Sequence, residues 1–148
     1  MKKISALVMI AFFAITSISC SSDDSSGGGA ATDGFTWTDS SGSTVQTVDN
    51  PYANGAFNSI FAVRSAATIY EINLTSLAVG TYALGGASAN ALYYNSTGTL
   101  GTSFSPTSGS VVITANANNK LSGTFTATGT GGGVTTVSGS FTNIVINP

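Results

Sequence analysis

Short hydrophobic segments alternate with turn residues along most of the chain. From Phe35 onward, runs rich in Thr, Val, Ile, Phe and Tyr are broken by Gly, Asn and Pro, a pattern that predicts β-strands. No segment combines a helical apolar period with a charged opposite face, so we expect little or no helix. Turn residues recur about every eight to twelve positions, as in sandwiches and small barrels. The pattern therefore predicts an all-β fold, an antiparallel sandwich or small barrel of about 9–11 short strands.

The same alternation places the individual strands. A first hairpin is expected from 35–39 and 44–48, a second from 59–65 and 68–74, and a third from 110–115 and 121–128. Further strands are expected at 80–84, 91–95, 100–104, 134–142 and 144–146.

The second hairpin suggests a particular register. Phe61 and Val63 share one face of the first strand, and Tyr70, Ile72 and Leu74 share one face of the second. If Val63 opposed Ile72 and Phe61 opposed Leu74, one face of the hairpin would be wholly apolar, as a strand pair on a core requires.

That register also places Arg64 opposite Glu71 on the outer face. We interpret the two as an exposed cross-strand ion pair that contributes about 0.2–1 kcal/mol. A binding clamp is the alternative interpretation.

Two similar segments lie near the end of the chain, Ser122-Gly123-Thr124-Phe125-Thr126 and Ser138-Gly139-Ser140-Phe141-Thr142. In each, a Phe alternates with small hydroxyl residues, as expected of a strand with one buried face. The Gly two positions before each Phe lies on the same face, where it indicates a bulge or a close crossing. We expect these segments to be the last two long strands of one sheet, joined through glycines 131–133.

The N-terminus has the pattern of a lipoprotein signal. Lys2 and Lys3 precede an unbroken apolar run at 6–15, and Cys20 follows a short stretch of small and polar residues. The run is shorter than the roughly 20 residues that a membrane-spanning helix needs, so we interpret 1–19 as a cleavable signal peptide. We predict that Cys20, the only cysteine, carries the lipid. Ser17 stands where such signals usually have Leu.

Residues 21–32 have no large apolar side chain, so we expect a flexible tether between the lipidated Cys20 and a single domain at 33–148. The segment Cys20-Ser21-Ser22-Asp23-Asp24 resembles the export signal of lipoproteins from Bacteroidetes, in particular flavobacterial ones. In those proteins, acidic residues just after the cysteine direct the protein to the outer face of the outer membrane. The resemblance implies that Ser22, Asp23 and Asp24 act with the lipoprotein export machinery, and that the domain faces the exterior.

Composition excludes several classes of function. Without Lys2 and Lys3, only Arg64 and Lys120 are basic, against six acidic side chains, so we expect no nucleic-acid partner. The chain has no histidine and only one cysteine, which removes the usual ligands of zinc, copper and iron and the Ser-His-Asp and Cys-His mechanisms. We therefore expect that the protein binds no cofactor and is not an enzyme.

Two groups of acidic residues leave weak alternatives open, a glycoside hydrolase site and a calcium site. Paired carboxylates for glycoside hydrolysis would have to come from Asp33, Asp39, Asp49 and Glu71, which the expected strands do not bring together. Asp39 with Asp49-Asn50 could form a weak calcium site from oxygen ligands, although Asp and Asn also cap turns.

Aromatic residues are the best candidates for a binding face. Trp37, Tyr52, Tyr93 and Tyr94 could stack on sugar rings, although aromatic side chains in a small domain mostly fill the core. Tyr93 and Tyr94 are adjacent on an expected strand, so only one of them can face the core. Thr-x-Thr spacings, such as Thr36 and Thr38, raise the alternative of an ice-binding face but follow no fixed period.

Three motifs of the domain also resemble those of small uncharacterised lipoproteins of Bacteroidetes whose domain has no known function. These motifs are Phe35-Thr36-Trp37, Gly80-Thr81-Tyr82-Ala83-Leu84 and the two closing Ser-Gly-Thr-Phe and Ser-Gly-Ser-Phe segments. The resemblance implies a β-sandwich-like domain and no particular activity. The first functional hypothesis is a non-enzymatic, membrane-anchored surface lipoprotein with a structural or accessory role. The second is a module that binds glycan or another small envelope ligand through an outward aromatic.

Overall fold

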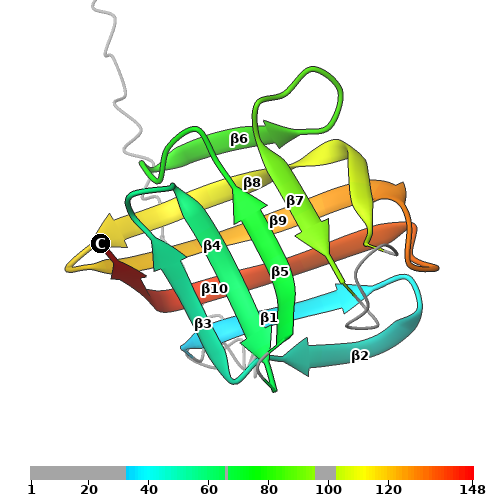
Figure 1. Ribbon diagram of the computed structural model, residues 1–148, viewed down its shortest axis with the longest axis horizontal. Helices are drawn as coiled ribbons and strands as arrows, with labels where there is room; N and C mark the ends of the chain where they lie inside the picture. The colour runs from blue at the N-terminus through cyan, green and yellow to red at the C-terminus, as the bar shows by residue number, and fades with distance from the viewer. Residues whose placement is uncertain (1–32, 66, 96–102) are drawn as a thin grey trace, which may run out of the picture.

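A computed structural model of the protein describes residues 33–65, 67–95 and 103–148, without the side chains of 43–47. These residues form a ten-stranded sheet, which confirms the all-β prediction (Figure 1). The strands are β1 (Gly34–Asp39), β2 (Gly42–Thr47), β3 (Asn50–Asn54), β4 (Ser59–Arg64), β5 (Ala67–Asn73), β6 (Gly80–Leu84), β7 (Ala91–Tyr94), β8 (Ser105–Ala117), β9 (Lys120–Thr130) and β10 (Thr136–Asn147).

The sheet folds into two layers that share β10. One layer has the order β6-β8-β9-β10-β1-β2, and the other has the order β3-β4-β5-β7. The strands of the two layers cross steeply in Figure 1. The first half of β10 pairs with β1, and its end, at Val145 to Asn147, pairs with β3. An isolated bridge between Tyr94 and Phe104 links the far edge of the second layer to the start of β8, so the sheet is nearly closed.

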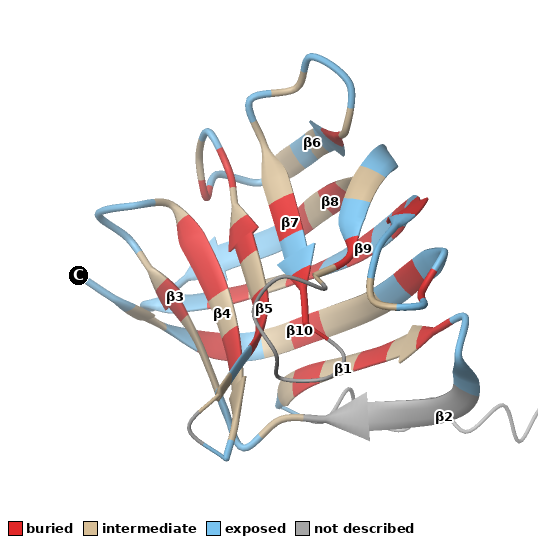
Figure 2. Cartoon of the chain, turned by 45° about the vertical axis from the view of Figure 1, so that its right-hand side comes forward, coloured by how far each residue is buried: buried red, intermediate tan, exposed pale blue. Residues whose placement is uncertain are grey.

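The space between the layers is filled by aromatic rings. Tyr70 of β5 is fully buried, and its ring lies within 5.2 Å, centroid to centroid, of the rings of Phe35, Trp37 and Phe125 and at 4.5 Å from Tyr94. Figure 2 shows the buried positions as bands that alternate with exposed ones along β8 and β9. Alternation of this kind indicates one face on the core and one on solvent.

The two similar C-terminal segments are neighbours in the sheet, on β9 and β10, as predicted. Their register explains the motif, because Phe125 lies opposite Gly139 and Phe141 lies opposite Gly123. A Cβ atom added to Gly139 would meet the Phe125 ring at 2.5 Å, and one added to Gly123 would meet the Phe141 ring at 2.5 Å. Each glycine therefore makes room for the aromatic ring of the other segment.

The long hairpin between β8 and β9 turns on two residues. Asn118 and Asn119 both have positive φ, at 54° and 56°, as a two-residue hairpin turn of the primed type requires. Asn tolerates this conformation better than most residues because its side chain can hydrogen-bond locally.

The predicted register of the β4–β5 hairpin is wrong. Phe61 lies opposite Glu71 rather than Leu74, and Ile60 lies opposite Ile72. The shift is an odd number of residues, which turns β4 over relative to β5. Ile60 and Ala62 face the core, and Phe61 and Val63 face outward and are half-buried.

A bulge changes this shift by one residue and makes it odd. Ala62 pairs with Tyr70, and the next pair is Val63 with Thr68, so Ile69 is an extra residue on β5. Bulges of this kind are not visible in a strictly alternating pattern.

The predicted ion pair between Arg64 and Glu71 is also wrong. Arg64 lies opposite Ala67, and its guanidinium carbon is 5.1 Å from the centre of the Trp37 ring. That geometry is a cation–π contact. Arg64 thus covers one side of the aromatic core.

Three further strand predictions need correction. Strand β3 was not expected, and it contains Pro51, a residue that is uncommon inside strands. Pro51 precedes the part of β3 that pairs with β10, and that pairing is parallel, whereas an antiparallel fold was expected. The strands expected at 134–142 and 144–146 are one strand, β10, with a bulge near Asn143. Of the strand expected at 100–104, residues 100–102 lie outside the described residues, and Phe104 forms only the isolated bridge.

A buried carboxylate links the two layers at one end of the aromatic core. The hydroxyl of Tyr94 donates to Oδ2 of Asp39 at 2.5 Å, and the backbone N–H of Ser41 donates to Oδ1 at 2.9 Å. Burial by itself would raise the pKa of Asp39, but the hydrogen bonds from Ser41 and Tyr94 outweigh it and hold this pKa below its usual value of 3.8. Burial, reinforced by Asp39, raises the pKa of Tyr94 to about 12.

We predict that Gly139→Ala destabilises the domain by about 1–3 kcal/mol, the usual cost of overpacking a core. The new methyl group would lie 2.3 Å from the carbonyl oxygen of Thr36, which the sheet holds in place. Gly80→Ala is the matched control, since nothing lies within 4 Å of its added Cβ. Urea unfolding measures both variants, and equal stability of the two would contradict the packing described.

We predict that the domain loses stability as the pH rises from about 10 to 12. Tyrosine ionises near pH 10 in the unfolded chain, whereas the pKa of Tyr94 is raised to about 12 in the fold. The folded state therefore binds the proton more tightly, and this stabilisation is complete below pH 10 and lost through that window. Asp39 acts in the opposite direction, and its contribution falls as the pH drops below about 4.

The variant Tyr94→Phe tests the hydrogen bond between Tyr94 and Asp39 at neutral pH. It should cost about 1–3 kcal/mol, because Asp39 keeps a buried oxygen without its donor. Tyr93→Phe is the control, since the neighbouring Tyr93 is exposed, and it should change the free energy of unfolding by less than about 0.5 kcal/mol. Unfolding curves across pH that are identical for wild type and Tyr94→Phe would rule the link out.

Candidate functional site: the outer face of the second layer

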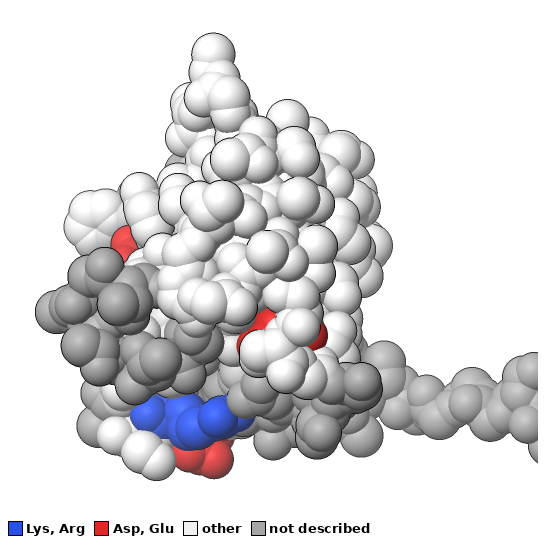
Figure 3. Space-filling view, turned by 90° about the vertical axis from the view of Figure 1, so that its right-hand side faces the viewer, with Lys and Arg blue, Asp and Glu red and all other residues white. Residues whose placement is uncertain are grey.

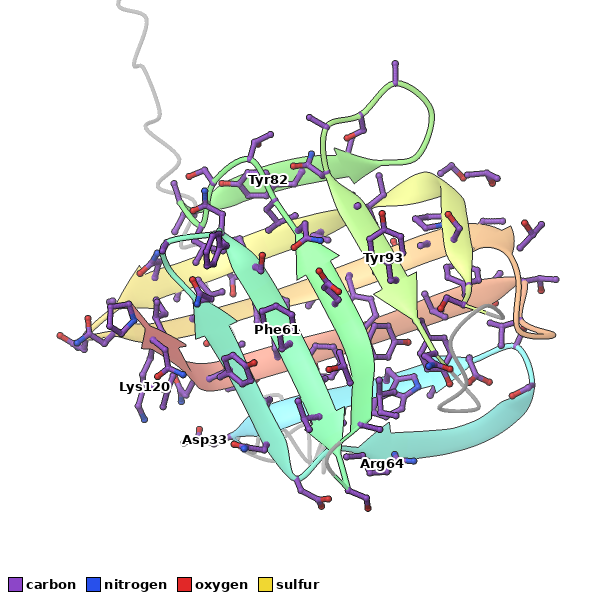
Figure 4. All side chains as sticks on the ribbon, in the orientation of Figure 1. Asp33, Phe61, Arg64, Tyr82, Tyr93 and Lys120 are labelled. Carbon is purple, nitrogen blue, oxygen red and sulfur yellow. The ribbon has the colours of Figure 1, made fainter. Side chains whose placement is uncertain are left out.

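Four outward residues stand in one row across the β3-β4-β5-β7 layer. Tyr52 lies opposite Phe61, Phe61 opposite Glu71, and Glu71 opposite Tyr93. We call these four residues the outer rung. Neighbouring strands lie about 4.7–4.9 Å apart, so the outer rung spans about 14 Å. Figure 4 shows Phe61 and Tyr93 on this layer, with β5 between them.

The aromatic members of the outer rung are accessible. The rings of Tyr52 and Phe61 are stacked, with centroids 5.1 Å apart and an interplanar angle of 26°, and both residues are half-buried. Tyr93 is exposed at 47%. The row therefore presents a double aromatic platform at one end and a single ring at the other, with a carboxylate between them.

A chain of hydrogen bonds orients the carboxylate. The Ser59 hydroxyl donates to Oδ1 of Asn73 at 2.6 Å, and Nδ2 of Asn73 donates to Oε1 of Glu71 at 3.0 Å. Ser59 is buried and lies directly opposite Asn73 in the sheet. A carboxylate has two oxygens and can accept about four hydrogen bonds, so Glu71 retains capacity for a further donor.

Two hollows flank Tyr93. One, of about 100 Å³, is lined by Thr68, Ile69, Glu71, Tyr93, Asn95 and Ser103. The other, of about 180 Å³, is lined by Gly85, Gly86, Ser88, Asn90, Ala91, Leu92, Tyr93, Ser105 and Pro106. Asn95 is 8% exposed, and its Oδ1 atom is buried without a hydrogen-bond partner among the described residues.

The four aromatic residues singled out in the sequence divide into two pairs. Tyr52 and Tyr93 lie on the outer rung. Trp37 and Tyr94 are each 2% exposed and belong to the core, so neither ring is offered to a ligand, which corrects that part of the prediction. Their burial follows from alternation, since Trp37 shares the inward face of β1 with Phe35 and Tyr94 stacks on Tyr70.

Sequence reasoning missed the two central members of the outer rung, Phe61 and Glu71. Phe61 was assigned to the core, and Glu71 to a pair with Arg64. Residue size could have indicated them: with Tyr94 already beside Tyr70 on β7, a small residue fits best opposite Tyr70 on β4, and Ala62, next to Phe61, is small.

The outer face of the other layer carries rows of hydroxyl residues. Thr36 bonds Ser140 at 3.2 Å and Thr38 bonds Ser138 at 3.1 Å, in each case through the side-chain oxygens. A shallow hollow of about 320 Å³ lies on this face, near Thr126. Thr36 and Thr38 thus belong to cross-strand rows in which their hydroxyls bond those of Ser140 and Ser138, and no aromatic residue lines the hollow.

Charge is sparse over the described surface. Figure 3 shows one face on which charged atoms form only a few small spots. Lys120 and Asp33 form an exposed pair with 3.9 Å between Nζ and Oδ2. Among the described residues, no group of three or more His, Cys, Asp and Glu could hold a metal ion. The Asp39 carboxylate, proposed for a calcium site, instead bonds Tyr94 and Ser41.

The residues predicted for anchoring and export, Cys20, Ser22, Asp23 and Asp24, lie outside the described residues, as do the expected signal peptide and tether. Within the described part of the chain, there is no helix of the length and apolarity required to cross a membrane.

Comparison with known proteins gives one match. A family model, described as a domain of unknown function, DUF6252, matches residues 29–145. No curated protein and no solved structure matches the chain. The matched range covers all of the strands from β1 to β9 and most of β10. The chain therefore belongs to the DUF6252 family, whose domain has no assigned function.

Proposed function

We propose that this protein is a non-enzymatic, lipid-anchored surface protein whose β-domain binds a glycan through the outer rung. The observation that carries the proposal is the alignment of Tyr52, Phe61, Glu71 and Tyr93 across four strands. Aromatic rings offer a flat apolar surface to the C–H face of a sugar, and carboxylate and amide groups accept its hydroxyl protons.

The residues around the outer rung support a polar ligand. Asn54 and Asn73 lie two residues further along β3 and β5 than Tyr52 and Glu71, on the same outer face of the sheet. Asn95 and Asn90 line the two hollows beside Tyr93. A few convergent polar groups beside apolar surface are typical of small-ligand sites. We favour the glycan hypothesis over a structural or accessory role because the exposed Tyr93 lies in line with Tyr52 and Phe61 among such polar groups.

The anchor is proposed from the N-terminal sequence. Lys2, Lys3 and the apolar run at 6–15 precede Cys20 as in a lipoprotein signal. Asp23 and Asp24 follow as in the export signal that the segment resembles. Acyl chains on Cys20 would hold the domain at the outer membrane through about 0.8 kcal/mol per buried CH₂, and the sparsely charged domain would face the exterior, where envelope and environmental glycans occur. Membership of the Bacteroidetes lipoproteins is part of this proposal.

We predict that Tyr93→Ala weakens glycan binding by about tenfold or more, since an exposed anchor ring commonly contributes over about 1 kcal/mol. Phe61→Ala should weaken it similarly by removing half of the stacked platform. The assay is a glycan array with the purified full-length protein, followed by titration of the best ligand.

Phe57→Ala provides the matched control. Phe57 is 75% exposed but lies in the turn between β3 and β4, off the outer rung, so its loss should leave the affinity within about twofold of wild type. Absence of binding across the array, or equal losses for Phe57→Ala and Tyr93→Ala, would refute the assignment.

We predict that Cys20→Ala moves the protein from the membrane fraction to the soluble fraction of fractionated cells, because the thioether that carries the lipid cannot form. The double variant Asp23→Asn, Asp24→Asn serves as its control. It should stay in the membrane fraction but become resistant to protease added to intact cells, because only export would be lost. Retention of Cys20→Ala in the membrane would exclude the anchor.

A further inference from the structure

We propose that the hollow between Glu71 and Asn95 is a specificity pocket. It would accept a hydrogen-bond donor of the bound sugar, a hydroxyl or an ammonium group, and would exclude a carboxylate. The inference rests on the proposed glycan binding and concerns which glycans are bound. Its lining residues are Thr68, Ile69, Glu71, Tyr93, Asn95 and Ser103.

The first observation is the unpartnered oxygen of Asn95. Burying an amide oxygen without a hydrogen bond costs about 1–3 kcal/mol, and such atoms are rare in folded proteins. Oδ1 of Asn95 has no partner among the described residues, and Asn95 lines the hollow. A donor group of a ligand in the hollow would satisfy this oxygen once the Asn95 side chain turns toward it.

The second observation is the orientation of Glu71. Asn73, itself held by Ser59, donates to Oε1 of Glu71, so the carboxylate is fixed at the wall of the hollow. Glu71 and Asn95 both line this hollow, and the Glu71 carboxylate gives it a negative charge. This arrangement attracts hydroxyl and ammonium groups and repels carboxylates, because like charges in contact are destabilising.

The third observation is the size and place of the hollow. A cavity of about 10–15 Å³ admits one water, so about 100 Å³ admits a group of several heavy atoms but not a whole sugar ring. Tyr93 forms one wall and is exposed. A sugar ring stacked on Tyr93 would therefore extend one substituent into the hollow. We infer that the protein binds neutral or amino-sugar glycans and discriminates against polyuronates.

Titration calorimetry with three probes tests the pocket: cellohexaose, which is neutral, chitosan hexamer, which carries ammonium groups, and hexagalacturonate, which carries carboxylates. The wild-type protein should bind at least one of the first two about tenfold more tightly than hexagalacturonate. The stronger of the two identifies the donor as hydroxyl or ammonium. Preference for hexagalacturonate would overturn the proposal.

Glu71→Gln preserves the shape of the side chain and removes its charge. Glu71→Gln should reduce the ratio of the affinity for the preferred probe to the affinity for hexagalacturonate about tenfold. Asp49→Asn, which removes an exposed charge outside the hollow, should leave this ratio within about twofold of the wild-type value. An unchanged preference in Glu71→Gln would overturn the proposal even if Tyr93→Ala abolishes binding. If Tyr93→Ala binds all probes as wild type does, the proposed function itself fails.

Discussion

The ring of Tyr70 fills the centre of the space between the two layers, and the residues around it have to fit its size. Its ring touches those of Phe35, Trp37, Tyr94 and Phe125 from three other strands and both layers. On β7, its direct neighbour across the sheet is Tyr94, stacked at 4.5 Å. On β4, the facing position must then be small, and it is Ala62. With Ala62 inward, strand alternation turns Phe61 outward, so the outer rung is a consequence of how the core is filled.

The glycines of β9 and β10 are part of the same packing arrangement. Large rings from several strands can share one interior only where facing positions lack side chains, and Gly123 and Gly139 provide that space beneath Phe141 and Phe125. The chain thus balances aromatic bulk with glycine and alanine across the sheet, as close packing requires. The Asp39 carboxylate is accommodated at one end of this interior because Tyr94 and Ser41 donate hydrogen bonds to it.

Local patterns predicted much of the fold. The parts that were not predicted depend on how strands pair with one another, which a local pattern does not show. Alternation of apolar and polar residues placed most strands within a few positions and required that one of Tyr93 and Tyr94 face outward. Register could not be read in the same way, because the bulge at Ile69 shifts β4 against β5 and buries two consecutive residues, Ile69 and Tyr70. Strand β3 was missed; it contains Pro51, and its parallel partner β10 lies far away in the sequence. The candidate site was therefore only partly predicted. Tyr93 follows from strand alternation, Tyr52 was selected only as an aromatic residue, and Phe61 and Glu71 depend on register.

In the proposed complex, the outward rings of the outer rung, and not the buried aromatic core, contact the ligand. Solution NMR of the uniformly labelled full-length protein, titrated with cellohexaose and chitosan hexamer, distinguishes the two sets of rings. The ring resonances of Tyr52, Phe61 and Tyr93 should shift with at least one probe, whereas those of Trp37 and Tyr70 should stay in place. Shifts confined to the hydroxyl rows around Thr38 and Thr126, or to Trp37 and Tyr70, would contradict it.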